Sequence, residues 1–316
     1  MELFLSCDWG TSAFRLRLIR VHDLHIVTAV TDNYGIADCY RLWSQQHTVP
    51  REEFYIARLK SQIGALGQKA KMPLDTIPVV LSGMASSSIG LMELPYKKLP
   101  FDLDGSDLLV DILNAGNDHP LIIISGTRTD NDVMRGEETK VLGWASALGE
   151  HNGEQLLILP GTHPKHIAIR DNQAVDFKTY MTGEFFDLLA NRSVLSASVE
   201  AGGDFENPAN QTCFCEGVEA GQAFDLLHMA FMVRTNQLIK QTPKTQNFYY
   251  LSGLLIGAEL KQITSRTPVC LVGGQMHSAL YARALQILGV PAVKTVDADS
   301  ALIRGQQVVF STHYFS

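Results

Sequence analysis

The chain has 316 residues, of which 46% are hydrophobic and 19% are charged, and its formal net charge is -7. This length is enough for two domains with separate cores, and the composition excludes a disordered or fibrous protein. The acidic balance, with no run of Lys or Arg, indicates that nucleic acid is not a partner.

Neither a signal segment nor a membrane span is evident in the sequence. The apolar stretches are far shorter than the roughly 20 residues that a membrane span needs, and no cationic segment precedes a long apolar one at the N-terminus. We therefore expect a cytoplasmic protein with no membrane partner. The cysteines are odd in number and scattered through apolar surroundings, which favours reduced core residues over disulfides or a metal site: Cys7, Cys39, Cys213, Cys215 and Cys270.

A turn at residues 8–12 follows an apolar strand at residues 3–7. Gly10 would let the backbone turn tightly beside an anion, and Thr11 and Ser12 offer N–H and O–H donors. Asp8 could hold a hydrated Mg²⁺ near phosphates. The pattern predicts a phosphate-binding hairpin, although an ordinary hairpin turn uses the same residue types.

Further elements of the first half follow from hydrophobic periodicity. The polar cluster at residues 82–90 comes after a buried strand, where open α/β sheets bind ligands, so Gly83, Ser86 and Ser87 are candidates for a polyhydroxylated carboxylate. A small-residue turn with a serine cap is the alternative. The predicted elements are strands around Leu16 and Ile26, a helix from Pro50 to Lys71, and strands Pro78 to Leu81 and Leu121 to Ser125.

A helix is predicted to begin at Gly136, with Glu137 and Glu138 in its first turn. One of these carboxylates could accept a proton from a hydroxyl that attacks a γ-phosphate. Arg135 could stabilise the charge of a substrate carboxylate or of the transferred phosphoryl group. The glutamates could equally be there because acidic residues favour a helix start, and Arg135 could form a surface ion pair.

The turn of residues 8–12 has a second copy at residues 160–165, again between two predicted strands. Two such units about half a chain apart resemble the actin, Hsp70 and sugar-kinase superfamily, in which each half supplies a phosphate-binding hairpin. The backbone of Gly161 and Thr162 is the expected phosphate contact. Lys165 could contact a phosphate too, although an exposed lysine on a strand is the ordinary expectation.

The rest of the second half alternates helices and strands, which predicts an α/β architecture. Gly273 and Gly274 resemble the adenosine-binding turn of the superfamily, and Gly253 is a further nucleotide candidate or a helix-packing residue. Thr182 and Glu184 could line the cleft as substrate-binding residues, or Thr182 could be a plain helix cap. The predicted elements are helices Thr182 to Ala190, Gly217 to Lys240, Leu251 to Thr264 and Ser278 to Gly289, a strand Pro268 to Val272, and a last helix around Asp299 to Val309.

Five blocks, in order, resemble the 2-dehydro-3-deoxygalactonokinase family: residues 8–12, 133–139, 160–165, 176–184 and 251–259. The resemblance implies a two-domain actin-like ATPase (ribonuclease H-like) α/β fold with an interdomain cleft. Residues 1–150 would bind the sugar acid and carry the first phosphate loop, and residues 151–316 would bind the nucleotide. The last helix could pack on the first domain, which the sequence leaves open.

The resemblance also implies ATP, Mg²⁺ and phosphorylation of the C6 hydroxyl of 2-dehydro-3-deoxy-D-galactonate in galactonate breakdown. Glu137 lies inside a matching block and is the expected base, with Arg135 and Asp8 beside the reaction and Asp8 at the metal; Glu138 and Asp132 are the alternative bases. An actin-fold phosphatase of the exopolyphosphatase type and a kinase for 2-dehydro-3-deoxy-gluconate are the rival functions. The sequence leaves open whether the protein forms a homodimer.

Overall fold

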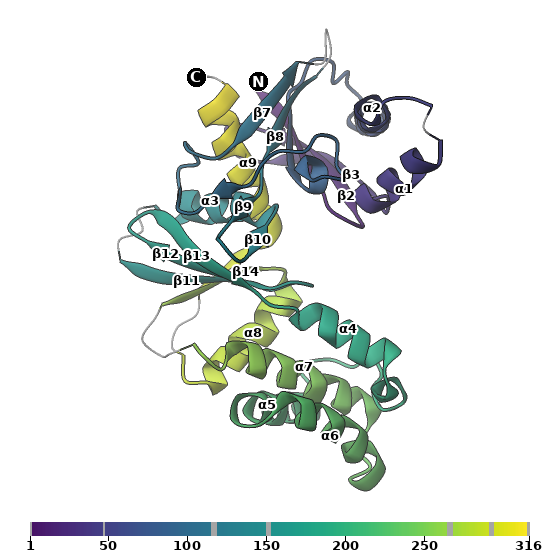
Figure 1. The fold of residues 1–316 in the computed structure, drawn as a ribbon, viewed down its shortest axis with the longest axis vertical. Coiled ribbons are helices and arrows are strands. Elements are labelled where there is room, and N and C mark those ends of the chain that lie inside the picture. Colours follow the sequence, from purple (N-terminus) through teal and green to yellow (C-terminus); the bar gives the residue numbers. More distant parts are fainter. Residues whose placement is uncertain are drawn as a thin grey trace. The chain divides into compact units, whose positions relative to one another are not determined.

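The computed structural model describes residues 2–46, 48–114, 119–149, 153–263, 268–290 and 294–314. The chain forms two compact units (Figure 1). Unit 1 comprises Met1–Asn152, Arg170–Asp176 and Ala298–Ser316, and unit 2 comprises Gly153–Ile169 and Phe177–Asp297. The division expected at residue 150 lies outside the described residues, and the C-terminal helix belongs to unit 1.

Unit 1 is built on a six-stranded sheet in the order β3-β2-β1-β4-β8-β7. Strand β1 is central, antiparallel to β2 and parallel to β4, and its Leu5 and Cys7 side chains are fully buried. The strands are β1 Leu3–Trp9, β2 Phe14–Arg20, β3 Ile26–Asp32, β4 Val79–Gly83, β7 Val110–Asn114 and β8 Pro120–Ile124. A smaller sheet has the order β10-β9-β5, with β5 Lys97–Lys98, β9 Thr127–Arg128 and β10 Val133–Met134.

The helices of unit 1 are α1 Ile36–Gln46, α2 Arg51–Ala70, α3 Glu137–Leu148 and α9 Ala298–Tyr314. Helix α2 matches the predicted helix and packs Tyr55, Leu59, Ile63 and Leu66 into the core at three- and four-residue spacing. Helix α1 was not predicted, because only Ile36 and Cys39 of its residues are buried and its apolar pattern is therefore short.

Helices α3 and α9 cross at two glycines. A Cβ atom on Gly143 would overlap the carbonyl oxygen of Ala301, and one on Gly305 would overlap that of Thr139. The backbones are therefore in direct contact at the crossing. Helix α9 also reaches the sheet, because the buried amide Nε2 of Gln306 donates to the carbonyl oxygen of Cys7 at 2.9 Å and to Ser82 Oγ at 2.8 Å.

Unit 2 joins a sheet to a group of helices. The strands are β11 Glu154–Leu159, β12 Lys165–Arg170, β13 Gln173–Thr179, β14 Val269–Gly273 and β15 Lys294–Asp297, in the order β15-β14-β11-β12-β13. Residues 170–176 count with unit 1, where β13 pairs with β6 Phe101–Asp102. The helices are α4 Thr182–Arg192, α5 Pro208–Ala223, α6 Leu226–Ile239, α7 Lys244–Leu260 and α8 Gln275–Ile287.

The prediction of a single helical region from Gly217 to Lys240 is wrong, because the structure has two helices, α5 and α6, over this range. Helix α5 ends at Ala223, and the carboxylate of Asp225 accepts hydrogen bonds from the backbone N–H groups of Leu227 and His228 to start α6. The predicted helix end at Thr264 lies outside the described residues.

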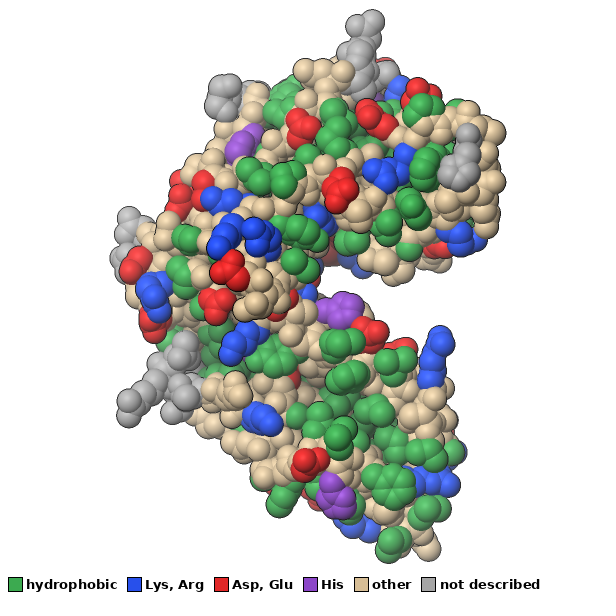
Figure 2. Space-filling model, in the orientation of Figure 1, with side chains coloured by type: hydrophobic (Ala, Val, Ile, Leu, Met, Phe, Trp, Pro, Cys, Tyr) green, Lys and Arg blue, Asp and Glu red, His purple; other side chains and the backbone are tan. Residues whose placement is uncertain are grey.

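Large hydrophobic side chains are exposed on and beside α6, and Figure 2 shows hydrophobic side chains gathered over this part of unit 2. They are Phe224, Leu227, Phe231, Leu238 and Ile239. In the parts of the chain that the structure describes, none of the helices has both the length and the apolar character to cross a membrane.

Candidate functional site

The first predicted hairpin is the β1–β2 turn of unit 1. Trp9 pairs with Phe14, and the Gly10 N–H donates to the carbonyl oxygen of Ala13 at 2.9 Å. The start of α1 contacts this turn, since the Ile36 N–H donates to the carbonyl oxygen of Gly10 at 2.9 Å. Thr11 and Ser12 are exposed at its tip. Gly10 has no positive φ and a Cβ there would make only ordinary contact at 3.5 Å, so the fold itself does not require this glycine.

Three segments of unit 1 meet beside this hairpin. Gly83 ends β4 with φ of 85°, and a Cβ atom on it would lie 2.9 Å from the carbonyl oxygen of Trp9 and 3.5 Å from Asp8 Oδ1. Gly136 precedes α3 with φ of 101°, and its Cβ would lie 3.1 Å from the Cα of Gly83. Both glycines are needed for their positive φ and for this close approach. The structure thus brings together Asp8, Gly83 and the start of α3.

The two glutamates at the start of α3 differ in their surroundings. Glu137 is partly exposed, and its Oε2 accepts a hydrogen bond from the Arg135 N–H at 3.0 Å. Glu138 is fully buried, and its two carboxylate oxygens accept from the Gly136 N–H at 2.9 and 2.8 Å. Both side chains therefore cap the helix start, as acidic first-turn residues commonly do. Of the two glutamates, only Glu137 is partly exposed.

Burial and the negative charge of Glu137 raise the pKa of Glu138 from 4.5 to about 7. The folded protein therefore binds the proton of the Glu138 carboxyl group more tightly than the unfolded chain does. The contribution of this proton to the free energy of unfolding is fully present below pH 4.5 and is lost as the pH rises through about 7.

We expect Glu138→Gln to flatten the pH dependence of the unfolding free energy in this window. The slope for one proton is at most about 1.4 kcal/mol per pH unit. Thermal unfolding of both proteins across the window measures it. Parallel curves for the two proteins would mean that Glu138 does not titrate there.

Arg135 is held on two sides. Its Nη1 donates to Ser86 O at 2.7 Å and to Ser86 Oγ at 2.6 Å, and the guanidinium carbon lies 4.2 Å from the ring centroid of Tyr96. Within the described parts of the chain, Arg135 Nε is buried without a hydrogen-bond partner and no carboxylate pairs with the guanidinium group. A fixed arginine with no acidic partner is suited to binding an anion.

The serine candidates are less accessible than the sequence indicates. Ser86 is fully buried, and its hydroxyl donates to Ile124 O at 2.7 Å while it accepts from Arg135. Ser87 is 5% exposed, and its hydroxyl donates to Met84 O at 2.8 Å. These hydroxyls are engaged within the protein, so Ser86 acts on the site through Arg135.

The second predicted hairpin is the β11–β12 turn of unit 2, and the start of α4 lies against it. The Glu184 N–H donates to Thr162 O at 3.1 Å, and His163 Nε2 lies 2.6 Å from Glu184 Oε2. A Cβ atom on Gly183 would overlap the carbonyl oxygen of Gly161. The structure therefore brings Glu184 to the hairpin residues Gly161 and Thr162.

Lys165 differs from an exposed strand lysine. It is only 4% exposed, and its Nζ donates to the carbonyl oxygen of His163 at 3.0 Å, inside its own hairpin. Its ammonium group thus stabilises the hairpin turn. The predicted contact of this group with a phosphate stays a prediction.

The glycine candidates of unit 2 fall into two places. Cβ atoms on Gly253 and Gly257 of α7 would overlap backbone atoms of α5, so close helix packing accounts for both, and the nucleotide role of Gly253 stays a prediction. Gly273 lies at the second hairpin, because its Cβ would be 3.3 Å from Pro160 Cδ. Gly274 has open space around it before α8. The turn at residues 273–274 and the hairpin at residues 160–165 therefore adjoin each other.

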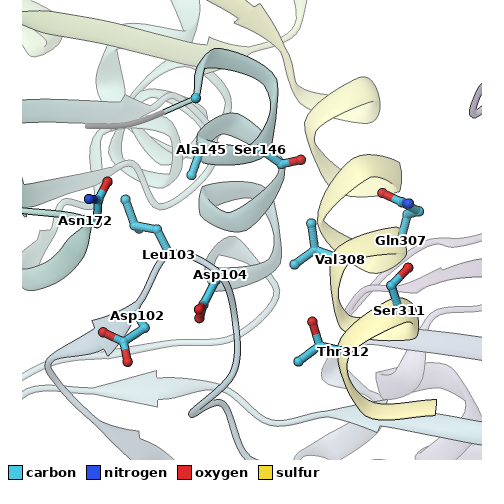
Figure 3. A pocket seen from close by; sticks show the side chains of 11 residues that line it. Asp102, Leu103, Asp104, Ala145, Ser146, Asn172, Gln307, Val308, Ser311 and Thr312 are labelled. Carbon is cyan, nitrogen blue, oxygen red and sulfur yellow. The ribbon is translucent and has the colours of Figure 1, made fainter. Parts of the chain in front are cut away.

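The candidate residues do not line either large cavity found among the described residues. One cavity of about 650 Å³ lies by the C-terminal ends of α3 and α9, between Asp104, Ser146 and Thr312 (Figure 3). A second, of about 700 Å³, lies beside the last turns of α2. Sequence patterns also did not identify Tyr96 or Gln306, because neither stands in a motif.

Comparison with known proteins adds family information. A model of the 2-keto-3-deoxy-galactonokinase family matches residues 8–309. The Escherichia coli 2-dehydro-3-deoxygalactonokinase is 34% identical over 240 residues, which cover 73% of this chain and 77% of that protein. A Rhizobium meliloti protein named "Probable 2-dehydro-3-deoxygalactonokinase DgoK1" is 31% identical over 316 residues, covering 96% of this chain and 94% of that protein.

Solved structures agree with the fold. The crystal structure of a Sinorhizobium meliloti protein described as "a putative 2-dehydro-3-deoxygalactonokinase protein" has a TM-score of 0.82 and 29% identity, covering 98% of this chain and 97% of that one. The activator of 2-hydroxyisocaproyl-CoA dehydratase from Clostridium difficile has a TM-score of 0.50 and 12% identity, covering 98% of this chain and 94% of that one. The expected α/β fold of the actin-like ATPases is confirmed.

Proposed function

Since the chain belongs to the 2-keto-3-deoxy-galactonokinase family, we propose that it transfers the γ-phosphoryl group of ATP to the C6 hydroxyl of 2-dehydro-3-deoxy-D-galactonate. Family membership makes it a sugar-acid kinase of galactonate catabolism. The observation that supports this chemistry best is at the start of α3, where the carboxylate of the partly exposed Glu137 accepts a hydrogen bond from the backbone N–H of Arg135, and the guanidinium group of Arg135 has no carboxylate partner among the described residues. One can accept a proton and the other can bind an acid.

In the proposed mechanism Glu137 removes the proton from the C6 hydroxyl as that oxygen bonds to the γ-phosphorus. The bond from the γ-phosphorus to the β,γ-bridging oxygen breaks, and ADP leaves with that oxygen and its electron pair. Arg135, fixed by Ser86 and Tyr96, binds the carboxylate of the sugar acid and thereby positions C6.

Asp8 is the proposed Mg²⁺ partner. Its side chain is 25% exposed beside the positive-φ Gly83, and among the described residues its ion-pair partner is Arg15, whose Nη1 lies at a long 3.5 Å from Asp8 Oδ2. The described residues contain no group of three or more metal-binding side chains, and one carboxylate suits Mg²⁺, which takes its other ligands from phosphates and water. When bound, Mg²⁺ would offset the charge of the ATP phosphates.

Each unit, taken by itself, carries residues proposed to bind the nucleotide. In unit 1 these are Gly10, Thr11 and Ser12, and in unit 2 the backbone of Gly161 and Thr162 with the turn at Gly273 and Gly274. Exposed N–H groups of such turns suit phosphate oxygens. The adjacency of Gly273 and Pro160 supports a single nucleotide surface in unit 2.

We expect Arg135→Lys to raise KM for the sugar acid about tenfold, because a lysine loses the second hydrogen bond of a bidentate carboxylate contact. KM for ATP should stay unchanged. Initial-rate kinetics with each substrate varied in turn measure both constants. Arg128→Lys is the matched control, since Arg128 is an exposed arginine on β9, which pairs with the strand β10 that precedes Arg135. An unchanged KM for the sugar acid in Arg135→Lys would remove Arg135 from the carboxylate site.

The function is tested by ADP release with 2-dehydro-3-deoxy-galactonate, 2-dehydro-3-deoxy-gluconate, common hexoses and no sugar. We expect ADP release to require the galactonate derivative. A preference for the gluconate derivative would change the substrate, because the two differ in the position of one hydroxyl. Phosphate release without sugar would favour the phosphatase of the exopolyphosphatase type and overturn the kinase.

We also propose a cytoplasmic homodimer, for which the exposed face of α6 is the candidate surface. Monomers rarely expose contiguous apolar patches larger than a few hundred Å², and Leu227 and Phe231 are 85% and 55% exposed one helical turn apart. Sedimentation of the wild type beside Leu227→Lys tests the dimer. A monomeric wild type would exclude it.

A further inference from the structure

A buried carboxylate lies behind the second hairpin of unit 2. Glu259 is near the end of α7, and its side chain is 1% exposed. It accepts hydrogen bonds from His166 Nε2 at 2.8 Å, from the Tyr281 hydroxyl at 2.7 Å and from Thr182 Oγ1. Its three partners come from β12, α8 and α4, so four elements of unit 2 meet at one side chain.

Each of the three donors lies in a segment that carries nucleotide candidates, follows them directly or contacts them. His166 is the second residue of β12, directly after the hairpin. Thr182 starts α4, whose Gly183 and Glu184 contact Gly161 and Thr162. Tyr281 is in α8, which follows the turn at residues 273–274.

The contribution of Glu259 to folding stability does not by itself account for a carboxylate at this buried position. Burying a carboxylate costs several kcal/mol, and a well-packed apolar residue of similar size is often as stable. What an apolar side chain could not do is accept three hydrogen bonds and hold their donors in one arrangement. Burial and the charge of Glu259 raise the pKa of Tyr281, so this hydroxyl remains a donor.

We propose that Glu259 is a positioning residue for ATP: it fixes the hairpin at residues 160–165, the start of α4 and helix α8 relative to one another. Backbone N–H groups bind the phosphate groups of ATP only when they are correctly spaced, so a shift of one segment weakens ATP binding. The inference rests on the proposed nucleotide role of these turns. It involves residues of unit 2 alone, whereas Arg135, to which we assign the carboxylate of the sugar acid, lies in unit 1.

The test is direct binding measured by calorimetry, with ATP and with the sugar acid separately. Glu259→Gln keeps the size of the side chain and removes its charge, and we expect the Kd for ATP to rise about tenfold while the Kd for the sugar acid is unchanged. Tyr281→Phe removes one donor and should shift the Kd for ATP in the same direction by less. Glu219→Gln, an exposed glutamate on α5, is the matched control and should change neither constant.

A folded Glu259→Gln protein that binds ATP as the wild type does would overturn the proposal, and so would equal weakening of both ligands. If Glu259→Gln does not fold, an unchanged Kd for ATP in Tyr281→Phe overturns it. Failure of the proposed function is a separate outcome, because wild-type protein would then bind ATP without phosphorylating the sugar acid.

Discussion

Glu137→Gln is expected to lower kcat by about 10²- to 10⁴-fold, the usual contribution of a general base. The amide retains an oxygen that can accept the hydrogen bond from the Arg135 N–H, now at 3.0 Å, so the helix start should keep its shape. Affinity for ATP should change little, because Glu137 acts on the hydroxyl and not on the nucleotide. Single-turnover kinetics with saturating sugar acid, together with ATP binding, measure both quantities.

The neighbouring glutamate provides the comparison for this experiment. Glu138→Gln removes an equally placed charge, but the side chain is fully buried and bound to Gly136, so its effect should be on stability and not on turnover. Near-normal turnover in Glu137→Gln would exclude Glu137 as the base. The base would then be sought in Asp132 or Glu138, and Asp132→Asn would be the next variant.

Gly143→Ala is expected to destabilise unit 1 by about 3 kcal/mol, because one added methyl group would overlap the backbone of α9. Helices α3 and α9 would have to separate at their crossing. The atoms that the methyl group would overlap belong to the backbone of α9, which cannot move aside as a flexible side chain can. For a domain of this size, the loss corresponds to a fall in Tm of roughly 6 to 12 °C. Thermal unfolding followed by circular dichroism measures it.

Gly64→Ala is the matched control, since Gly64 is also inside a helix but a Cβ atom there has nothing within 4 Å. Alanine is favoured over glycine in a helix by about 1 kcal/mol, so this variant should raise Tm slightly. If Gly143→Ala unfolded at the temperature of the wild type, the close crossing of α3 and α9 would be disproved.

Local patterns carried much of the fold. The alternation on either side of residues 8–12 and 160–165 predicts both hairpins, and the spacing of Leu59, Ile63 and Leu66 predicts α2. The break between α5 and α6 was missed because apolar residues continue across it and only the cap at Asp225 marks it. Long-range partners have no local signal at all, as Gln306 and its bond to Cys7 across 299 residues illustrate.

For the candidate site, the sequence indicated residue types and segments, and it did not indicate their contacts. Residue types and spacing single out Glu137, Arg135 and Gly83, and the structure brings their segments together. The sequence could not indicate that Ser86 orients Arg135, that Tyr96 stacks on it, or that Lys165 turns into its own hairpin. Such details depend on which side chains tertiary packing brings close.

The contacts of Gln306 have a consequence for the order in which the protein can be made. Its amide also reaches Val80 O, and 226 residues separate these two partners. At roughly 5 to 20 residues per second, a ribosome needs about 11 to 45 s to synthesise that interval. The whole of unit 2 is therefore synthesised before α9. The contacts of β1 and β4 with Gln306 can form only after the last helix has been synthesised. Nascent chains interrupted before residue 298 would lack α9 and expose the unfinished side of unit 1 to chaperones and proteases.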